Sequence, residues 1–280
     1  MRAPFALGAG FFYCHETGFS VPNKSRTNLP LLTVDVGNSR TKVAVCEEGD
    51  KALPSCVEFV PFNNSELDRI RKQIGLLATR YKLTRCVVAG SNGKLREELL
   101  GSFRSHSLEA IVLRSFEQIP VEATVDSPQS VGIDRLLNAL GAKILSPTGS
   151  TILVDSGTAT TVDLVVDGAF HGGAILPGLR LSAMSLHDYT DALPLIDTGQ
   201  LSVEGTKVPG KNTVQAIEAG VMLGQIGSIR EIVSEYQNAA PEADLVLTGG
   251  AAERLTPAFS QAEIRPYLSL RAMASLGIHK

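Results

Sequence analysis

Two stretches of sequence, one in each half of the chain, decide the fold. Residues 33–43 read TVDVGNSRTKV, and residues 153–163 read LVDSGTATTVD. In both, an apolar run ends in an aspartate, a glycine follows two residues later, and a second run of strand-forming residues begins after the turn. The pattern predicts two strands joined by a tight turn, and its recurrence predicts a duplicated structural unit.

The residue types at these turns suit a nucleotide polyphosphate. Glycine lets backbone N–H groups approach phosphate oxygens closely, and Asn38, Ser39 and Thr158 add neutral hydrogen-bond donors. Asp35 and Asp155, at the strand ends, can each hold a hydrated cation that offsets phosphate charge. Either hairpin alone would be an ordinary acidic turn, but the repetition favours two phosphate loops that face each other.

The rest of the chain alternates strand and helix patterns, which favours an α/β protein. We expect a disordered N-terminal extension at residues 1–30, a first domain at residues 31–146 and a second domain at residues 147–280. Strands are predicted at residues 31–35, 42–46, 86–89, 110–113, 151–155, 160–166, 169–171 and 245–247. Helices are predicted at residues 65–81, with Ser65 or Asn64 as the cap, 93–100, 132–145 and 213–236.

Composition excludes several classes of protein. The chain has 26 Lys and Arg against 29 Asp and Glu, so nucleic acid is not an expected partner. It contains no run of 18 apolar residues, so no membrane-spanning helix is expected. Its four cysteines include no Cys-x-x-Cys pair, which argues against a zinc site and for reduced thiols in the cytoplasm. Residues 205–212, GTKVPGKN, lack the final Ser or Thr of a P-loop.

Further motifs resemble one family. Residues 132–135 (GIDR), 155–161 (DSGTATT), 172–178 (GGAILPG), 191–194 (DALP) and 210–213 (GKNT) resemble type III pantothenate kinase, in order and from residue 31 to near the C-terminus. This family belongs to the superfamily of actin, hexokinase and Hsp70, whose adenosine segment resembles residues 245–252. The resemblance implies a duplicated ribonuclease H-like, actin-like ATPase fold with two domains around a nucleotide cleft.

The resemblance also implies a reaction, the transfer of the γ-phosphoryl group of ATP to the primary hydroxyl of pantothenate, which begins coenzyme A synthesis. Asp134 matches the catalytic base of the family, and Arg135 the guanidinium that binds the substrate carboxylate through a bidentate pair. The substrate-binding positions are Gly132, Ile133, Asp134, Arg135 and Thr213. Gly172, Gly173, Pro177 and Gly178 are expected to shape the backbone.

For ATP, the resemblance implies that Asp35 coordinates Mg²⁺ on the phosphates and that Thr158 contacts the nucleotide. Asp155 matches the position that binds a monovalent cation, K⁺ or NH₄⁺. The first phosphate loop would be lined by Asp35, Val36, Gly37, Asn38, Ser39, Arg40, Thr41 and Lys42. The family also implies a homodimer whose pantothenate pocket uses both chains.

One departure from the family affects the substrate pocket. Val125 stands where the family carries a tyrosine, although Pro128 is kept. Two alternatives to pantothenate kinase are another small-molecule kinase of the superfamily and a non-catalytic accessory factor for transcription. The chain lacks the motifs of sugar kinases, which argues against the first alternative. The second predicts that Asp35, Asp134 or Asp155 is replaced by another residue, but all three are present.

The N-terminal segment offers a first test. Residues 1–29 show no apolar periodicity that would tie them to a folded core. We expect that deleting them leaves the melting temperature and the rate of ADP release almost unchanged. Calorimetry and a coupled assay on the full-length and truncated chains would check this, and a large loss of either would show that the segment docks.

Overall fold

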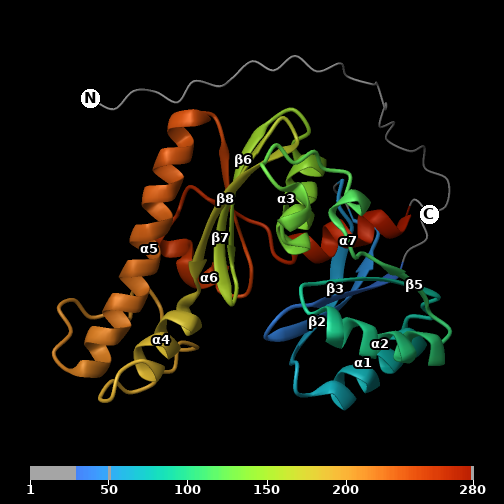
Figure 1. The fold of residues 1–280 in the computed structure, drawn as a ribbon, viewed down its shortest axis with the longest axis horizontal. Coiled ribbons are helices and arrows are strands. Elements are labelled where there is room, and N and C mark those ends of the chain that lie inside the picture. Colours follow the sequence, from blue (N-terminus) through green and yellow to red (C-terminus); the bar gives the residue numbers. More distant parts are fainter. Residues whose placement is uncertain (1–29, 50–51, 279–280) are drawn as a thin grey trace.

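The computed structural model describes residues 30–49 and 52–278, which form two five-stranded sheets in separate halves of the molecule (Figure 1). The first sheet contains β1 (Leu31–Val36), β2 (Arg40–Glu47), β3 (Ser55–Asn63), β4 (Arg85–Ala89) and β5 (Glu109–Val112). The second contains β6 (Ser150–Ser156), β7 (Ala159–Val166), β8 (Ala169–Pro177), β9 (Asp244–Thr248) and β10 (Glu263–Ile264). Apart from residue 30, the predicted extension lies outside the described residues.

Both sheets have the same topology. The first sheet has the order β3-β2-β1-β4-β5, and the second, read in the same direction, has the order β8-β7-β6-β9-β10. β1 pairs antiparallel with β2 and parallel with β4, and β6 pairs in the same way with β7 and β9. Three antiparallel strands followed by two parallel ones form the ribonuclease H-like sheet. The prediction of a duplicated α/β fold is therefore confirmed.

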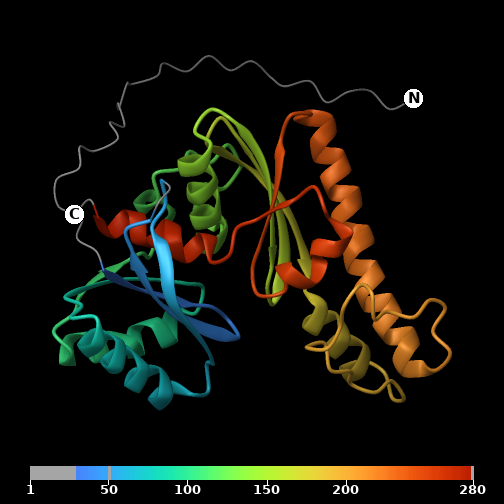
Figure 2. The same cartoon turned by 180° about the vertical axis from the view of Figure 1, so that it is seen from behind.

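Helices cover the outer faces of both sheets. α1 (Leu67–Arg80) and α2 (Gly93–Ser105) share a core with the outer face of the first sheet. α4 (Leu179–Asp188), α5 (Thr213–Ala239) and the short α6 (Ala252–Leu255) share a core with the outer face of the second. Figures 1 and 2 show α5 along one side of the molecule and α1 and α2 at the opposite end. The inner faces are thus left for the two remaining helices.

The two inner helices are exchanged between the halves. α3 (Ile133–Leu145) follows the first sheet along the chain but contacts β6, β7 and β8. α7 (Leu268–Ile278) ends the second half but contacts β1, β2, β3 and β4. The helices also pack closely on each other, since a Cβ on Gly141 would lie 2.5 Å from Leu268 Cδ1. One core therefore runs through both halves, and the boundary predicted at residue 146 stays a prediction.

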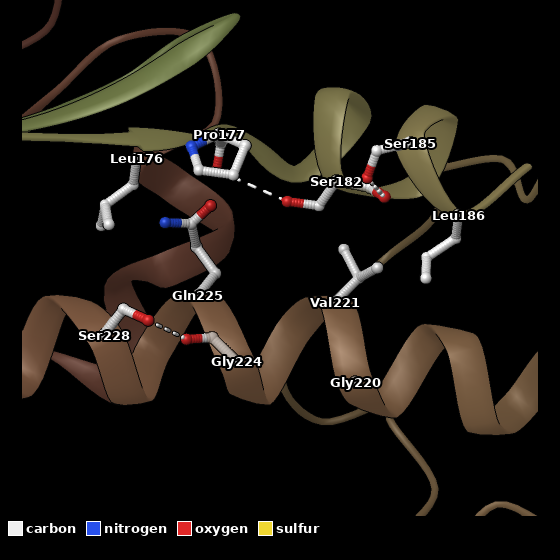
Figure 3. Close-up of a pocket in the computed structure, with 10 residues that line it drawn as sticks. All are labelled: Leu176, Pro177, Ser182, Ser185, Leu186, Gly220, Val221, Gly224, Gln225 and Ser228. Atoms are coloured by element: carbon white, nitrogen blue, oxygen red, sulfur yellow. Dashed lines mark hydrogen bonds between the residues drawn. The ribbon is translucent and has the colours of Figure 1, made fainter. Parts of the chain in front are cut away.

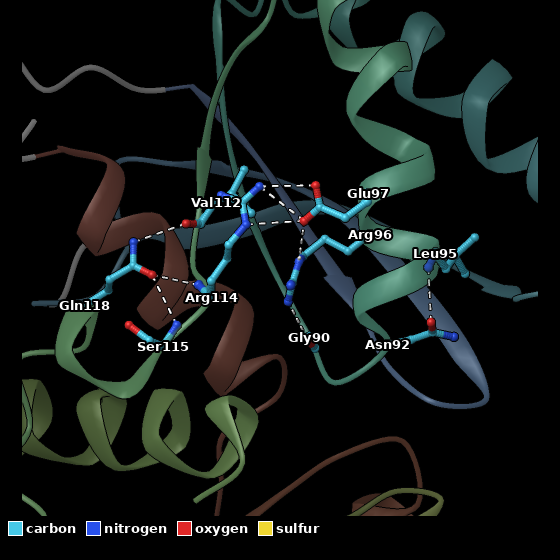
Figure 4. A network of polar contacts seen from close by, with 9 residues as sticks. All are labelled: Gly90, Asn92, Leu95, Arg96, Glu97, Val112, Arg114, Ser115 and Gln118. Carbon is cyan, nitrogen blue, oxygen red and sulfur yellow. Dashed lines mark hydrogen bonds and ion pairs between the residues drawn. The ribbon is translucent and has the colours of Figure 1, made fainter. Parts of the chain in front are cut away.

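The turn after β4 is pressed against the end of β1. Gly90 has a φ of +125°, and a Cβ there would lie 2.3 Å from the carbonyl oxygen of Val36. Asn92 N–H donates to the same oxygen at 3.0 Å. In Figure 4, Arg96 Nη1 donates to the Gly90 carbonyl at 3.0 Å from the first turn of α2. The end of β1, which leads into the first predicted phosphate loop, is therefore fixed by the close contact of Gly90 and by the hydrogen bond from Asn92.

Some elements differ from the sequence prediction. β3 was not predicted because Pro61 interrupts its pattern, but β3 lies at the sheet edge, where proline is tolerated. α7 was not predicted because its residues are buried almost all round, which removes the amphipathic period. The expected cap of α1 is wrong, since the N-cap is Glu66 and makes no side-chain cap bond. Among the described helices, none is both long and apolar enough to cross a membrane.

Candidate active site

Asp35 lies at the end of β1 and forms an ion pair across the first hairpin. It is 6% exposed, and Lys42, its register partner on β2, donates to its Oδ2 at 2.9 Å. This carboxylate raises the pKa of Lys42 well above its usual value, and the carboxylates of Asp155 and Asp134 add to the rise. Lys42 is therefore a firmly charged ammonium among aspartates from both halves of the chain.

The first hairpin turn is closed by backbone bonds and tied down by one side chain. Gly37 N–H donates to the Arg40 carbonyl at 3.0 Å. Asn64 Nδ2 donates to the carbonyls of Gly37 and Asn38 at 2.8 and 2.9 Å, and its Oδ1 accepts from the Thr41 hydroxyl at 2.9 Å. Of the predicted loop residues, Asn38, Ser39 and Arg40 are exposed, whereas Val36 and Thr41 are buried.

Asn64 is a site residue that sequence reasoning missed. It was one of two expected caps of α1, with Ser65, but its amide instead bonds to the turn of the first hairpin. An Asn directly after a strand commonly bonds to nearby backbone, but this signal was hidden because β3 itself was not predicted. Its loop partners lie too far back in the sequence for that signal to identify them.

The second hairpin repeats this arrangement around Asp155. Gly157 N–H donates to the Ala159 carbonyl at 3.0 Å, so the turn leaves Thr158 exposed. Gly178 N–H donates to the Thr158 carbonyl at 3.0 Å and supports the turn from the end of β8. Asp155 Oδ2 accepts from Asn138 Nδ2 at 2.8 Å. Asn138 is 2% exposed on α3, and its own Oδ1 has no partner among the described residues.

A glycine turn after β9 supports Asp155 as Gly90 supports the first loop. Gly249 has a φ of +91°, and a Cβ there would lie 2.3 Å from Asp155 Oδ1 and 2.6 Å from the Ser156 carbonyl oxygen. Ala251 N–H donates to that carbonyl at 3.0 Å, as Asn92 N–H does to Val36. The structural repeat therefore includes the supports of the two loops as well as the loops.

Asp134 lies in the first turn of α3, which begins after Gly132. Its Oδ1 accepts from the Arg135 N–H at 3.0 Å, and the residue as a whole is exposed. The protein around its carboxyl group nevertheless removes part of its water, which raises the pKa of Asp134, and the charges of Asp35 and Asp155 raise it further. A carboxylate with a raised pKa is a stronger proton acceptor than an ordinary aspartate.

The structure thus brings together most of the predicted site. Figures 1 and 2 show the turns of the β1–β2 and β6–β7 hairpins side by side between the halves, in agreement with the effect of Asp155 on Lys42. No group of three or more His, Cys, Asp or Glu residues close enough to hold a metal occurs in the described part of the chain. Asp35 is a single carboxylate, which fits Mg²⁺ held mainly by phosphates and water.

Thr213 is not brought to Asp134 within the chain. It is exposed at the start of α5, whose core lies on the opposite face of the second sheet from α3. A cavity of about 270 Å³ lies between β8, α4 and α5 (Figure 3). Its lining includes Pro177, which was expected to shape the backbone, together with Ser182 and Gln225, and it includes none of the predicted site residues. The cavity is therefore separate from the aspartates.

The repeated topology and the paired loops define the class of protein, an actin-like ATPase or kinase fold. Among solved structures, a protein from Sinorhizobium meliloti proposed to be a 2-dehydro-3-deoxygalactonokinase matches with a TM-score of 0.52 at 13% identity, over 88% of this chain and 97% of its own. A Baf family protein from Campylobacter jejuni matches with a TM-score of 0.57 at 21% identity, over 88% and 96%. At these identities the matches show the fold alone.

Sequence comparison narrows the class to a family. The family model of type III pantothenate kinase matches residues 31–235. A type III pantothenate kinase from Flavobacterium johnsoniae is 33% identical over 80% of this chain and 87% of its own length. This chain belongs to the type III pantothenate kinase family.

The support of Asp155 by Gly249 can be tested with a matched pair of substitutions. We expect Gly249→Ala to lower the free energy of unfolding by about 1–3 kcal/mol, because it combines a disfavoured φ with a collision at Asp155. Gly250→Ala is the control, since a Cβ there would meet nothing within 4 Å. Urea denaturation of both variants would measure the difference, and equal stabilities would contradict this account of the turn.

Proposed function

We propose that this chain transfers the γ-phosphoryl group of ATP to the primary hydroxyl of pantothenate, giving 4'-phosphopantothenate, the first product of coenzyme A biosynthesis. The observation that carries the proposal is that Asp134 lies close enough to both hairpins to interact electrostatically with their charged residues. These residues are Asp35 and Lys42 of the first hairpin and Asp155 of the second. Membership of the kinase family gives the reaction class, and phosphoryl transfer requires this combination of positioning and charge stabilisation.

ATP is proposed to bind between the two hairpins. The exposed turn residues Asn38, Ser39 and Arg40 on one side and Thr158 on the other would contact the phosphates. Lys42 supplies a fixed positive charge beside them. Mg²⁺ near Asp35 and K⁺ or NH₄⁺ near Asp155 would offset the phosphate charge when bound. The firmly charged Lys42 alone balances only one of the neighbouring carboxylates, which supports a need for such cations.

Pantothenate is proposed to bind at the start of α3, through Gly132, Ile133, Asp134 and Arg135. Asp134 orients the hydroxyl and accepts its proton as the phosphoryl group transfers. Arg135 binds the carboxylate through its planar guanidinium. Val125, which replaces the tyrosine of the family, packs among apolar residues of the shared core and lies near Gly172. The pocket is therefore more apolar there than the family pattern implies.

The position of Thr213 supports a homodimer. Because α5 lies across the second sheet from α3, Thr213 can reach a pantothenate molecule only if it belongs to a second chain. We propose that each pocket is completed in this way and that the enzyme acts in the cytoplasm, where its substrate ATP is found. Another small-molecule kinase is the second candidate, while a non-catalytic role is disfavoured by the intact Asp35, Asp134 and Asp155.

Asp134→Asn tests the proposed base, because it removes the charge and keeps the side-chain volume. We expect kcat to fall by roughly 10²–10⁴, the usual size of a general-base contribution. ATP binding should change little, since the phosphate loops are separate elements. Steady-state kinetics and calorimetric titration with ATP would measure both effects.

The matched control for this variant is Asp68→Asn, whose side chain is 97% exposed on α1. It should keep the wild-type kcat and ATP affinity. If Asp134 only pairs at the surface, Asp134→Asn would cost about 1 kcal/mol of stability or less and leave kcat intact. A kcat within about threefold of wild type would therefore refute the assignment of the base.

A second prediction concerns the monovalent cation. We expect turnover to depend on K⁺ or NH₄⁺ and to be nearly absent with Na⁺ alone, and we expect Asp155→Ala to lose most of the activity. Initial rates at constant ionic strength in the three chloride salts would measure the dependence. Equal rates in sodium and potassium would remove the reason to place a cation at Asp155.

A further inference from the structure

We propose that Asp163 is a positioning residue that fixes the guanidinium of Arg135 so that one of its edges faces the substrate carboxylate. The inference rests on the proposed function and gives a role to Asp163, for which the sequence motifs implied none. Asp163 lies on β7 and is 1% exposed, whereas Arg135 lies on α3 with its side chain 14% exposed. The pair therefore joins the base-bearing helix to the second sheet.

The hydrogen bonds of the pair use only part of the guanidinium. Arg135 donates Nε at 3.0 Å and Nη2 at 2.5 Å to Asp163 Oδ1. Its Nη1 has no acceptor among the described residues. This atom is not buried, so it can be reached by solvent or by a ligand. A guanidinium has two edges that can each grip a carboxylate, Nε with Nη2 and Nη1 with Nη2. Asp163 occupies the first edge with a single oxygen, Oδ1, while its buried Oδ2 has no partner among the described residues, and the second edge is left for a ligand.

The surroundings restrict the guanidinium to this orientation. Its carbon lies 5.1 Å from the centre of the Phe170 ring, which covers one face. Gly173 is the register partner of Asp163, and a Cβ there would lie 2.2 Å from Asp163 Oδ1. Gly173 therefore leaves the room that the carboxylate needs. This gives one of the glycines that were expected to shape the backbone a specific role.

A purely structural ion pair is the competing explanation. α3 is already fixed to the second sheet by the bond from Asn138 to Asp155 and to the first half by its packing on α7. A further buried charge pair would add little to this docking, because burying two charges costs about as much as their attraction returns. The orientation of Arg135 is a property that apolar packing could not supply.

Asp163→Asn tests the inference, since it keeps the shape and removes the charge that attracts the guanidinium. In the full-length enzyme we expect KM for pantothenate to rise by about 10–100-fold, as for the loss of a charge-assisted hydrogen bond. kcat and KM for ATP should stay within about threefold. For a pantothenate analogue whose carboxylate is replaced by an alcohol, wild type and variant should have similar KM values.

Two further variants make the result specific. Asp244→Asn, an exposed aspartate on β9, should match wild type in every parameter. Arg135→Lys keeps the charge but lacks the two-edged fork, so it should show the same selective rise in KM for pantothenate without altering Asp163. In the double variant Asp163→Asn with Arg135→Lys, the two effects should not multiply, because both act on one contact.

The outcomes separate this inference from the proposed function. A wild-type enzyme that does not phosphorylate pantothenate would refute both. An active wild type whose Asp163→Asn variant keeps its KM, or loses affinity equally for pantothenate and the alcohol analogue, would overturn the role of Asp163 alone. If Asp163→Asn does not fold, Asp163→Glu decides, because it keeps the charge but moves the carboxylate relative to Nε and Nη2 of Arg135: a KM for pantothenate equal to that of wild type would overturn the inference, and a selective rise would support it.

Discussion

The pairing of a carboxylate at the end of the first strand of each sheet is the constraint on which the site depends. Asp35 is buried and Asp155 is half-buried, and a carboxylate removed from water is unfavourable unless it is paired or hydrogen-bonded. Asp35 is paired with Lys42, its register partner on the next strand, so the first hairpin is held in one register. Asp155 accepts from Asn138, which fixes α3 against the second sheet and brings Asp134, one turn earlier on that helix, to the two loops.

The exchange of α3 and α7 makes this site a product of both halves. The helix that bears Asp134 is encoded with the first sheet but packs on the second, while α7 does the reverse. The continuous core through both helices couples the positions of the two phosphate loops. A displacement of either sheet would therefore move Asp134, the proposed base, relative to Lys42, and phosphoryl transfer is sensitive to such displacements.

The elements that sequence predicted well are those with a local cause. The Asp-x-Gly turns and their strands follow from short apolar runs bounded by turn residues, so β1, β2, β6 and β7 were expected near their observed bounds. Two sets of hydrogen bonds could not be predicted from spacing because they join residues distant in sequence. They are those of Asn64 with the first loop and of Arg135 with Asp163. The exposed position of Thr213, across a sheet from Asp134, likewise depends on tertiary packing.

The charges of the assembled site explain why a net acidic arrangement can serve an anionic substrate. Four carboxylates, Asp35, Asp134, Asp155 and Asp163, stand against the two cations Lys42 and Arg135. Lys42 and Arg135 are already paired with Asp35 and Asp163, so Asp134 and Asp155 keep uncompensated charge. Loss of water and the charges of Asp35 and Asp155 together raise the pKa of Asp134. A nucleotide polyphosphate adds further negative charge and can bind at this site only together with cations. The acidic residues therefore make the binding of ATP inseparable from the binding of its counterions, and Arg135 keeps a free edge for the smaller anion.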